Sequence, residues 1–226
     1  MVTAPKSGPD IKQLILVPAI ISFAVTILRL VGELNHWAPS LFSREAGGGG
    51  SLLGVTWLVP IFGVYFAMRL IREGYTPRSN LKVIAFAVIG AIAGMVLFVP
   101  FINREPTDPV AVLMTFVGAG VGIAFQRLAW PELFKTLLAY AFAVRIPVAI
   151  VMLVAIVGDW GTHYDVAPAP PGGLPEMSLL AKWFFIGAVF QFSFWIMFTL
   201  VIGSLSGGVA AMVMRAKTRE EAPQAT

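Results

Sequence analysis

Six apolar stretches, separated by short polar segments, make up most of the chain. They cover residues 14–34, 52–71, 83–101, 110–125, 136–157 and 179–214. A helix needs about 20 apolar residues to cross a hydrocarbon core about 30 Å thick, so each stretch predicts one membrane-spanning helix, although the fourth is short and rich in glycine. The pattern therefore predicts an all-α fold, a polytopic integral membrane bundle of six transmembrane helices.

The last stretch is too long for one perpendicular crossing. We expect it to tilt, to break near Gly207 and Gly208, or to continue beyond the membrane. The second and fifth stretches each contain a proline, Pro60 and Pro147. Three spans in each half would give halves of inverted topology, and interrupted helices in matching positions of such halves often form a transporter's substrate site.

Composition agrees with a membrane protein. Hydrophobic residues make up 58% of the chain and charged residues 12%, whereas about a quarter of the residues of a soluble domain are charged. The lipid bilayer is therefore the partner that the sequence indicates. The chain has no cysteine, which excludes disulfides, thiolate catalysis and iron–sulfur ligation, and no motif points to a particular cofactor.

The basic residues orient the six spans. If the amino terminus is cytoplasmic, eleven of the sixteen Lys and Arg residues fall on the cytoplasmic side, four fall outside and Arg145 lies within the membrane. This asymmetry is the positive-inside pattern, and it predicts a multi-pass protein of the cell membrane with both termini in the cytoplasm. Because the basic residues sort by membrane side, the net charge of +4 does not indicate a nucleic acid partner, and none is expected.

The same orientation divides the chain into three parts. Residues 1–13 form a cytoplasmic leader, residues 14–214 form one transmembrane domain, and residues 215–226 form a polar cytoplasmic tail. The expected external loops cover about 35–51, 102–109 and 158–178.

Arg145 is the most informative residue, because it lies near the middle of the fifth apolar stretch. At 1.5 Å per residue it is about 18 Å from Val157 at the outer end. A guanidinium at this depth is costly in lipid, so we expect its side chain to point into the bundle, toward Gln191 and Trp195 of the last span. These three residues are the candidate substrate-binding residues. The alternative, weighed equally, is an arginine with a purely structural role.

A glycine run before the second span gives a candidate anion site. Free backbone amides at the start of a helix can hold an anion, and Arg44 would add a positive charge beside Gly49, Gly50 and Ser51. The spacing matches no Walker motif, and a run of glycines is also typical of a flexible loop, which we favour.

Both histidines fall on the predicted outer side, together with several carboxylates. His163, Asp159 and His36 are candidate catalytic residues, since a histidine and a carboxylate can act as an acid–base pair. His36, His163 and Asp165 are candidate metal ligands. The spacing fits no strong metal motif, and loop carboxylates usually face water.

Three pairs of glycines have the GxxxG spacing that lets helices approach closely. We expect them to pack helices within the bundle, with a dimer face as the alternative. The pairs are Gly90 with Gly94, Gly118 with Gly122, and Gly203 with Gly207.

Three functions remain open from the sequence. The leading hypothesis is a small transporter or channel-like protein that handles an anionic or polar small molecule through Arg145. The second is a non-catalytic subunit of a larger membrane complex, with partner subunits or a second copy of the chain. The third is a membrane-embedded enzyme with an external site of histidine and carboxylate residues.

Overall fold

The structure is a computed structural model that describes residues 8–48, 51–166 and 176–221, with the side chains described as far as Arg215. Six of its helical spans are long and apolar enough to cross a membrane, as the hydropathy pattern predicted. The first five spans contain α1 (Ile11–Leu34), α2 (Leu58–Arg72, preceded by the 3₁₀ turn η2, Val55–Trp57), α3 (Asn80–Phe98), α4 (Pro109–Ala129) and α5 (Pro131–Gly158). The last span consists of α6 (Leu179–Lys182), the π-helical turn η4 (Trp183–Ala188), α7 (Val189–Phe192) and α8 (Phe194–Glu221). This is the architecture of a multi-pass integral membrane protein.

Several helices begin where the sequence supplies a cap. The Asp10 carboxylate accepts a hydrogen bond from the amide of Gln13 at the start of α1. The Asp108 carboxylate accepts hydrogen bonds from the amides of Val110 and Ala111 at the start of α4. These bonds satisfy amides that have no partner within the helix, so the boundaries are set locally.

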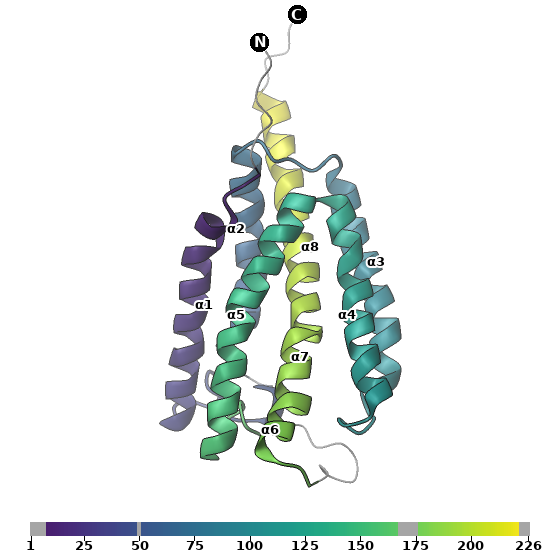
Figure 1. Cartoon of the computed structure of the whole chain (residues 1–226). Helices are drawn as coiled ribbons and strands as arrows, with labels where there is room; N and C mark the ends of the chain where they lie inside the picture. Colours follow the sequence, from purple (N-terminus) through teal and green to yellow (C-terminus); the bar gives the residue numbers. More distant parts are fainter. Residues whose placement is uncertain (1–7, 49–50, 167–175, 222–226) are drawn as a thin grey trace, which may run out of the picture.

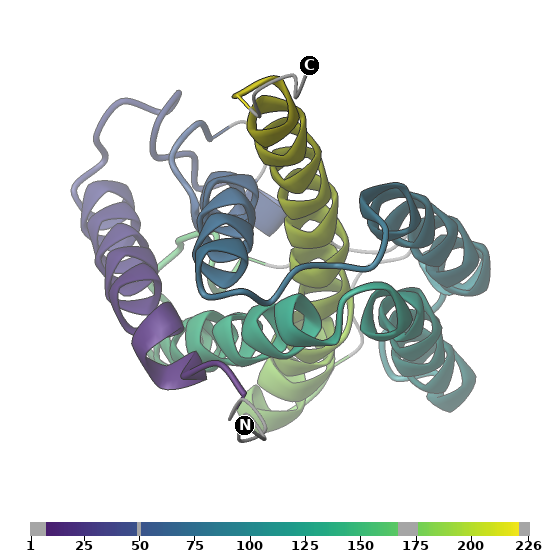
Figure 2. The same cartoon turned by 90° about the horizontal axis from the view of Figure 1, so that it is seen from above.

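The helix α8 lies at the centre of the bundle (Figures 1 and 2). It packs against α2, α3, α4 and α5, while α1 lies on the outside and contacts mainly α5. The hairpin of α3 and α4 lies on one side of α8, and α1, α2 and α5 lie on the other. The two ends of the chain and the connections before α3 and before α5 gather at one end of the bundle, which we call the terminal end, and the opposite end is the loop end.

All three glycine pairs pack helices within the chain. A Cβ atom on Gly90 would lie 2.4 Å from the Gly122 carbonyl oxygen, and one on Gly94 would lie 2.8 Å from the Gly118 carbonyl oxygen, so α3 and α4 are in backbone contact. A Cβ atom on Gly207 would lie 3.1 Å from the carbonyl oxygen of Gly63, so the backbones of α8 and α2 also approach closely. The expectation of packing within the bundle is confirmed at these positions.

The last span does not break near Gly207 and Gly208, which was one of the three alternatives expected for it. The helix α8 continues through Gly207 and Gly208 and projects past the other helices at the terminal end (Figure 1). The break lies instead at Ser193, whose φ of −120° and ψ of −85° separate α7 from α8, and a π-helical turn precedes it. Gly207 and Gly208 stay helical because α2 and α3 pack against them, where a flexible kink would lose those contacts.

The expected symmetry of the two prolines is also wrong. Pro60 is the third residue of α2, in the first turn, where the missing amide has no helical partner to lose. Pro147 lies inside α5, which continues past it. The two prolines therefore do not interrupt corresponding helices, and the argument from inverted halves loses its support.

Candidate functional site

A cavity of about 810 Å³ lies in the loop-end half of the bundle. Its walls come from α1, α3, α4, α5, the π-helical turn, α7 and the start of α8, and the loops before η2 and after α5 border it. Its volume is within the range of about 300–1,000 Å³ that is common for sites of small molecules. Toward the terminal end the bundle is filled by a continuous apolar core, whose largest buried side chains include Phe66, Leu133, Leu137, Tyr140 and Leu200. The cavity is thus bordered by loops at one end and closed by packed side chains at the other.

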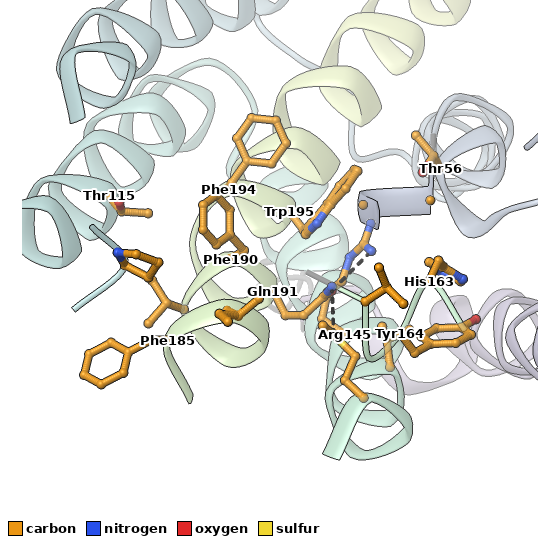
Figure 3. Close-up of a pocket in the computed structure, with 18 of the residues that line it drawn as sticks. Thr56, Thr115, Arg145, His163, Tyr164, Phe185, Phe190, Gln191, Phe194 and Trp195 are labelled. Carbon is orange, nitrogen blue, oxygen red and sulfur yellow. Dashed lines mark hydrogen bonds between the residues drawn. The ribbon is translucent and has the colours of Figure 1, made fainter. Parts of the chain in front are cut away.

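Arg145 lines the cavity, and its side chain is almost completely buried, with 3% of its surface exposed. Its Nη1 donates a long hydrogen bond of 3.5 Å to Gln191 Oε1, and its Cζ lies 4.8 Å from the centre of the Trp195 ring. Figure 3 shows Arg145 reaching toward these two side chains. The predicted inward direction of Arg145 and its contacts with Gln191 and Trp195 are therefore confirmed. That these residues bind a substrate stays a prediction.

The rest of the Arg145 guanidinium is unsatisfied. Its Nε and Nη2 are buried without a hydrogen-bond partner among the described residues, and no carboxylate of this part of the chain forms an ion pair with it. The Nε–H and one N–H of Nη2 share an edge of the guanidinium plane, the geometry that binds a carboxylate or phosphate through two parallel hydrogen bonds. Since burying a cation without compensation is costly, this edge is suited to an anion.

The helical break at Ser193 lies between the two partners of Arg145. Gln191 is in α7, just before the break, and Trp195 is in α8, just after it. The Ser193 hydroxyl donates a hydrogen bond to the Val189 carbonyl, which satisfies a backbone oxygen at the break. An irregular helix segment that borders a cavity is a common device at the functional sites of membrane proteins, because polar backbone there is not exposed to lipid.

A second polar cluster, Arg29–Glu33–His163, lies nearer the loops. Glu33 is completely buried, and its Oε1 lies 2.8 Å from Arg29 Nε and 2.5 Å from His163 Nδ1. Its Oε2 accepts a hydrogen bond of 2.9 Å from the His163 amide. The next residue, Tyr164, donates its hydroxyl proton to the Thr26 carbonyl oxygen at 3.2 Å. These contacts fix the segment after α5 onto the end of α1, so the cluster holds one wall of the cavity in place.

The charge of His163 follows from its surroundings. Burial lowers the pKa of the His163 imidazole, and the neighbouring Arg29 guanidinium lowers it further, whereas the Glu33 carboxylate opposes this shift. The pKa is lowered below the ordinary value of about 6.5, so the ring is neutral at pH 7. His163 therefore adds no positive charge to the cavity at neutral pH.

Arg44 and His36 form a separate contact between the two loops. Arg44 Nε donates a hydrogen bond of 2.6 Å to the Gly161 carbonyl, its Nη2 bonds the Trp160 carbonyl at 3.3 Å, and its Nη1 lies 2.5 Å from His36 Nε2. The structure thus brings the two expected external loops together. It does not bring His36 into the polar cluster of His163.

The carboxylates proposed as catalytic or metal-binding have other partners. Asp165 accepts hydrogen bonds from the amides of Gly161 and Thr162 and from the Thr162 hydroxyl, all between 2.6 and 2.7 Å. Asp159 caps the end of α5 in a left-handed conformation. Among the residues that the structure describes, no three His, Asp or Glu side chains are grouped as a metal site would require. His36, His163 and Asp165 therefore do not converge as the metal hypothesis expected.

The candidate anion site before the second span is not at a helix start. Gly49 and Gly50 lie outside the described residues. Ser51 donates its hydroxyl proton to the Leu41 and Leu53 carbonyl oxygens, and Arg44 is occupied by the loop after α5. Since the helical turn of this span begins only at Val55, the described part of the site does not present free helix amides to an anion.

Part of the polar cluster of Arg29, Glu33 and His163 could be predicted from the sequence. The i,i+4 spacing of Arg29 and Glu33 places both side chains on one helix face, and the predicted topology puts Glu33 on the same side as His163. Nothing in the sequence predicted the three-residue cluster with Arg29, since 130 residues separate Glu33 from His163. A scan against protein-family models found no matching family, and searches of curated proteins and of solved structures found no significant match. The function is therefore argued from the site itself.

Proposed function

We propose that this membrane protein binds an anionic small molecule at Arg145 and carries it across the bilayer. The observation that supports this proposal is the unsatisfied edge of the Arg145 guanidinium in a cavity large enough for a small molecule. Charged residues inside a membrane usually pair with one another or mark a pathway for a solute. Arg145 has no carboxylate partner among the described residues, which favours the second role.

Two further features favour transport over binding alone. The cavity is bordered by loops at one end and closed by the apolar core at the other, which is the arrangement of a site accessible from one side. The break at Ser193 places Gln191 and Trp195 on different helix segments, so a small change at the break would alter the site. Discontinuous helices are typical of transporter sites near the middle of the membrane.

The proposed orientation places the loop end outside the cell and both termini in the cytoplasm. Eleven basic residues support it, because they lie in the leader, the tail and the segments at the terminal end. They are Lys6, Lys12, Arg69, Arg72, Arg78, Lys82, Arg127, Lys135, Arg215, Lys217 and Arg219. The four on the opposite side are Arg29, Arg44, Arg104 and Lys182.

Reporter fusions test this orientation. We expect a cytoplasmic signal from fusions after Thr226 and within residues 72–82, because the basic residues there resist translocation. Fusions within residues 35–51 and 167–173 should report the exterior. A cytoplasmic signal from both of these loops would reverse the orientation.

Replacement of Arg145 tests the function. We expect Arg145→Met to fold, because apolar side chains of similar volume often replace buried polar groups without loss of stability. It should lower the affinity for the bound anion at least about a hundredfold, since two hydrogen bonds to a charged group contribute about 1.5–3 kcal/mol each. Arg145→Lys should retain only part of the affinity, because an ammonium cannot bind through two parallel bonds.

The measurement uses purified protein in lipid nanodiscs and a panel of chloride, phosphate, acetate and octanoate, with binding followed by calorimetry. Arg127→Met is the matched control, since Arg127 is exposed at the terminal end and its loss should change no affinity. Equal binding of the whole panel by wild type and Arg145→Met would refute the site. Arg145-dependent binding without flux of the bound anion in proteoliposomes would refute transport.

A membrane-embedded enzyme is the second candidate function, and one contact favours it. His163 lines the cavity and its Nδ1 lies 2.5 Å from Glu33 Oε1, so the carboxylate is close enough to orient a histidine base. Mass spectrometry of the bound anion separates the two candidates. Recovery of the anion unchanged agrees with transport, and its conversion to a product that disappears in His163→Gln would favour the enzyme.

A further inference from the structure

We infer that the ligand of the Arg145 cavity is an amphipathic monoanion, with one negatively charged head at Arg145 and an elongated apolar body along the cavity wall. This inference rests on the proposed anion site and adds the chemical class of its ligand. It follows from the unpaired charge of Arg145, the hydrogen-bond donors beside it and the carbon surface of the cavity walls.

Arg145 is the one arginine of the cavity lining that has no carboxylate partner among the residues that the structure describes. Arg29 is paired with Glu33 at 2.8 Å, and Arg104 is paired with Asp108 at 3.0 Å. His163 is neutral at pH 7, as described above. Arg145 remains without a carboxylate in the part of the chain that the structure describes, so one negative charge on the ligand would pair with it.

The loop-end part of the cavity disfavours a second negative charge. Two acidic residues, Glu105 and Asp165, are among the residues that line it there. Like charges brought together in partly buried surroundings repel each other, so a ligand with carboxylates at both ends would place one of them in an unfavourable field. The charged head is therefore expected at one end of the ligand only.

The donors around Arg145 fit one head group. Among the described residues, Nε and Nη2 of Arg145 have no hydrogen-bond partner, and the one partner of the Gln191 amide nitrogen is the Met152 sulfur, at 3.5 Å. Sulfur is a weak acceptor, so an oxygen of the ligand would replace it favourably. A carboxylate or a phosphodiester anion could accept from both residues at once, and the Trp195 ring covers the guanidinium face.

The remaining walls are mostly carbon. The long side chains that line the space between α5 and the α3–α4 hairpin include Phe98, Met152, Phe185, Phe190 and Phe194. Figure 3 shows the Phe190 and Phe194 rings near each other and Phe185 apart from them, all on the side of the pocket nearer Thr115. A small hydrated anion would leave this surface in contact with water, whereas an apolar body would cover it.

Chain length provides the test. Wild-type protein in nanodiscs of phosphatidylcholine is titrated with acetate, butyrate, hexanoate and octanoate at pH 7.5, and with the eight-carbon α,ω-dicarboxylate and octanol. Each methylene that leaves water adds about 0.8 kcal/mol, which is about fourfold in affinity. We expect affinity to rise at least about a hundredfold from acetate to octanoate, and octanoate to bind at least about tenfold more tightly than the dicarboxylate. Arg145→Met is titrated in parallel, and its signal is subtracted because it measures partition of the ligand into lipid. In this variant octanoate should bind no better than octanol.

The outcomes separate this inference from the proposed function. Arg145-dependent binding that is as tight for acetate or phosphate as for octanoate would overturn the inference and leave the anion site standing. Absence of any Arg145-dependent binding would overturn both. A free carboxylate and a monoanionic lipid share the inferred chemistry, and nanodiscs with added phosphatidylglycerol distinguish them: weaker octanoate binding there identifies the lipid as a ligand of the same class, and unchanged binding identifies the free anion.

Discussion

Glu33→Gln is expected to lower the free energy of unfolding by about 3–5 kcal/mol, the usual cost of removing one partner from a buried ion pair. The Glu33 carboxylate is completely buried and has three partners, namely the Arg29 guanidinium, the His163 imidazole and the His163 amide. A neutral amide cannot compensate the Arg29 charge, and its NH₂ group would face groups that donate hydrogen bonds. The segment after α5 should then separate from α1.

The chain contains a matched control for this prediction. Arg69 and Glu73 have the same residue types and the same i,i+4 spacing as Arg29 and Glu33, but 44% and 35% of their side-chain surfaces are exposed. Exposed pairs contribute about 0–1 kcal/mol, so Glu73→Gln should have little effect. Unfolding is measured in mixed micelles by titration with sodium dodecyl sulfate. The double variant Arg29→Met with Glu33→Gln should recover part of the loss, and equal effects of Glu33→Gln and Glu73→Gln would show that the buried cluster does not stabilise the fold.

Gly63→Ala is expected to destabilise the bundle, whereas Gly120→Ala should stabilise it slightly. A Cβ atom on Gly63 of α2 would lie 2.6 Å from the carbonyl oxygen and 2.8 Å from the Cα of Gly203 in α8. Because these are backbone atoms, the two helices must move apart, and such overpacking costs about 1–3 kcal/mol. A Cβ atom on Gly120 has no atom within 4 Å, so alanine there gains the better helix propensity of up to about 1 kcal/mol.

The sign difference makes this pair informative. The same substitution is made in two helices of the same membrane protein, and only the approach of a second backbone differs. The change in stability of each purified variant is measured by thermal unfolding in the same detergent. Ser206→Ala should not rescue Gly63→Ala, since the Gly203 backbone remains in place. A Gly63→Ala variant as stable as Gly120→Ala would mean that α2 and α8 are not in backbone contact at this position.

The sequence by itself determined the class of the protein and the number of its spans. A helix in lipid must satisfy its backbone internally and present apolar side chains, so 20-residue apolar stretches are sufficient to locate the crossings. The same local argument predicted that Arg145 faces the interior, because no neighbouring surface in lipid can compensate a guanidinium. The GxxxG pairs were predictable as packing positions for a related reason, since close approach needs small residues at a fixed spacing.

Only the tertiary structure decided which polar groups are satisfied. Arg29 and Arg145 are both arginines of apolar helices, yet Arg29 has the Glu33 carboxylate and Arg145 has one long hydrogen bond. The contact of Glu33 with His163 depends on how a loop far along the chain folds back onto α1, and a hydropathy pattern does not predict that placement. The break at Ser193 was missed for the same reason: its residues are ordinary helix residues by sequence, and the packing of the last span around the cavity determines where the helix becomes irregular. Hydropathy reports the environment of a segment, whereas the candidate site is defined by distances between segments, and these depend on the whole bundle.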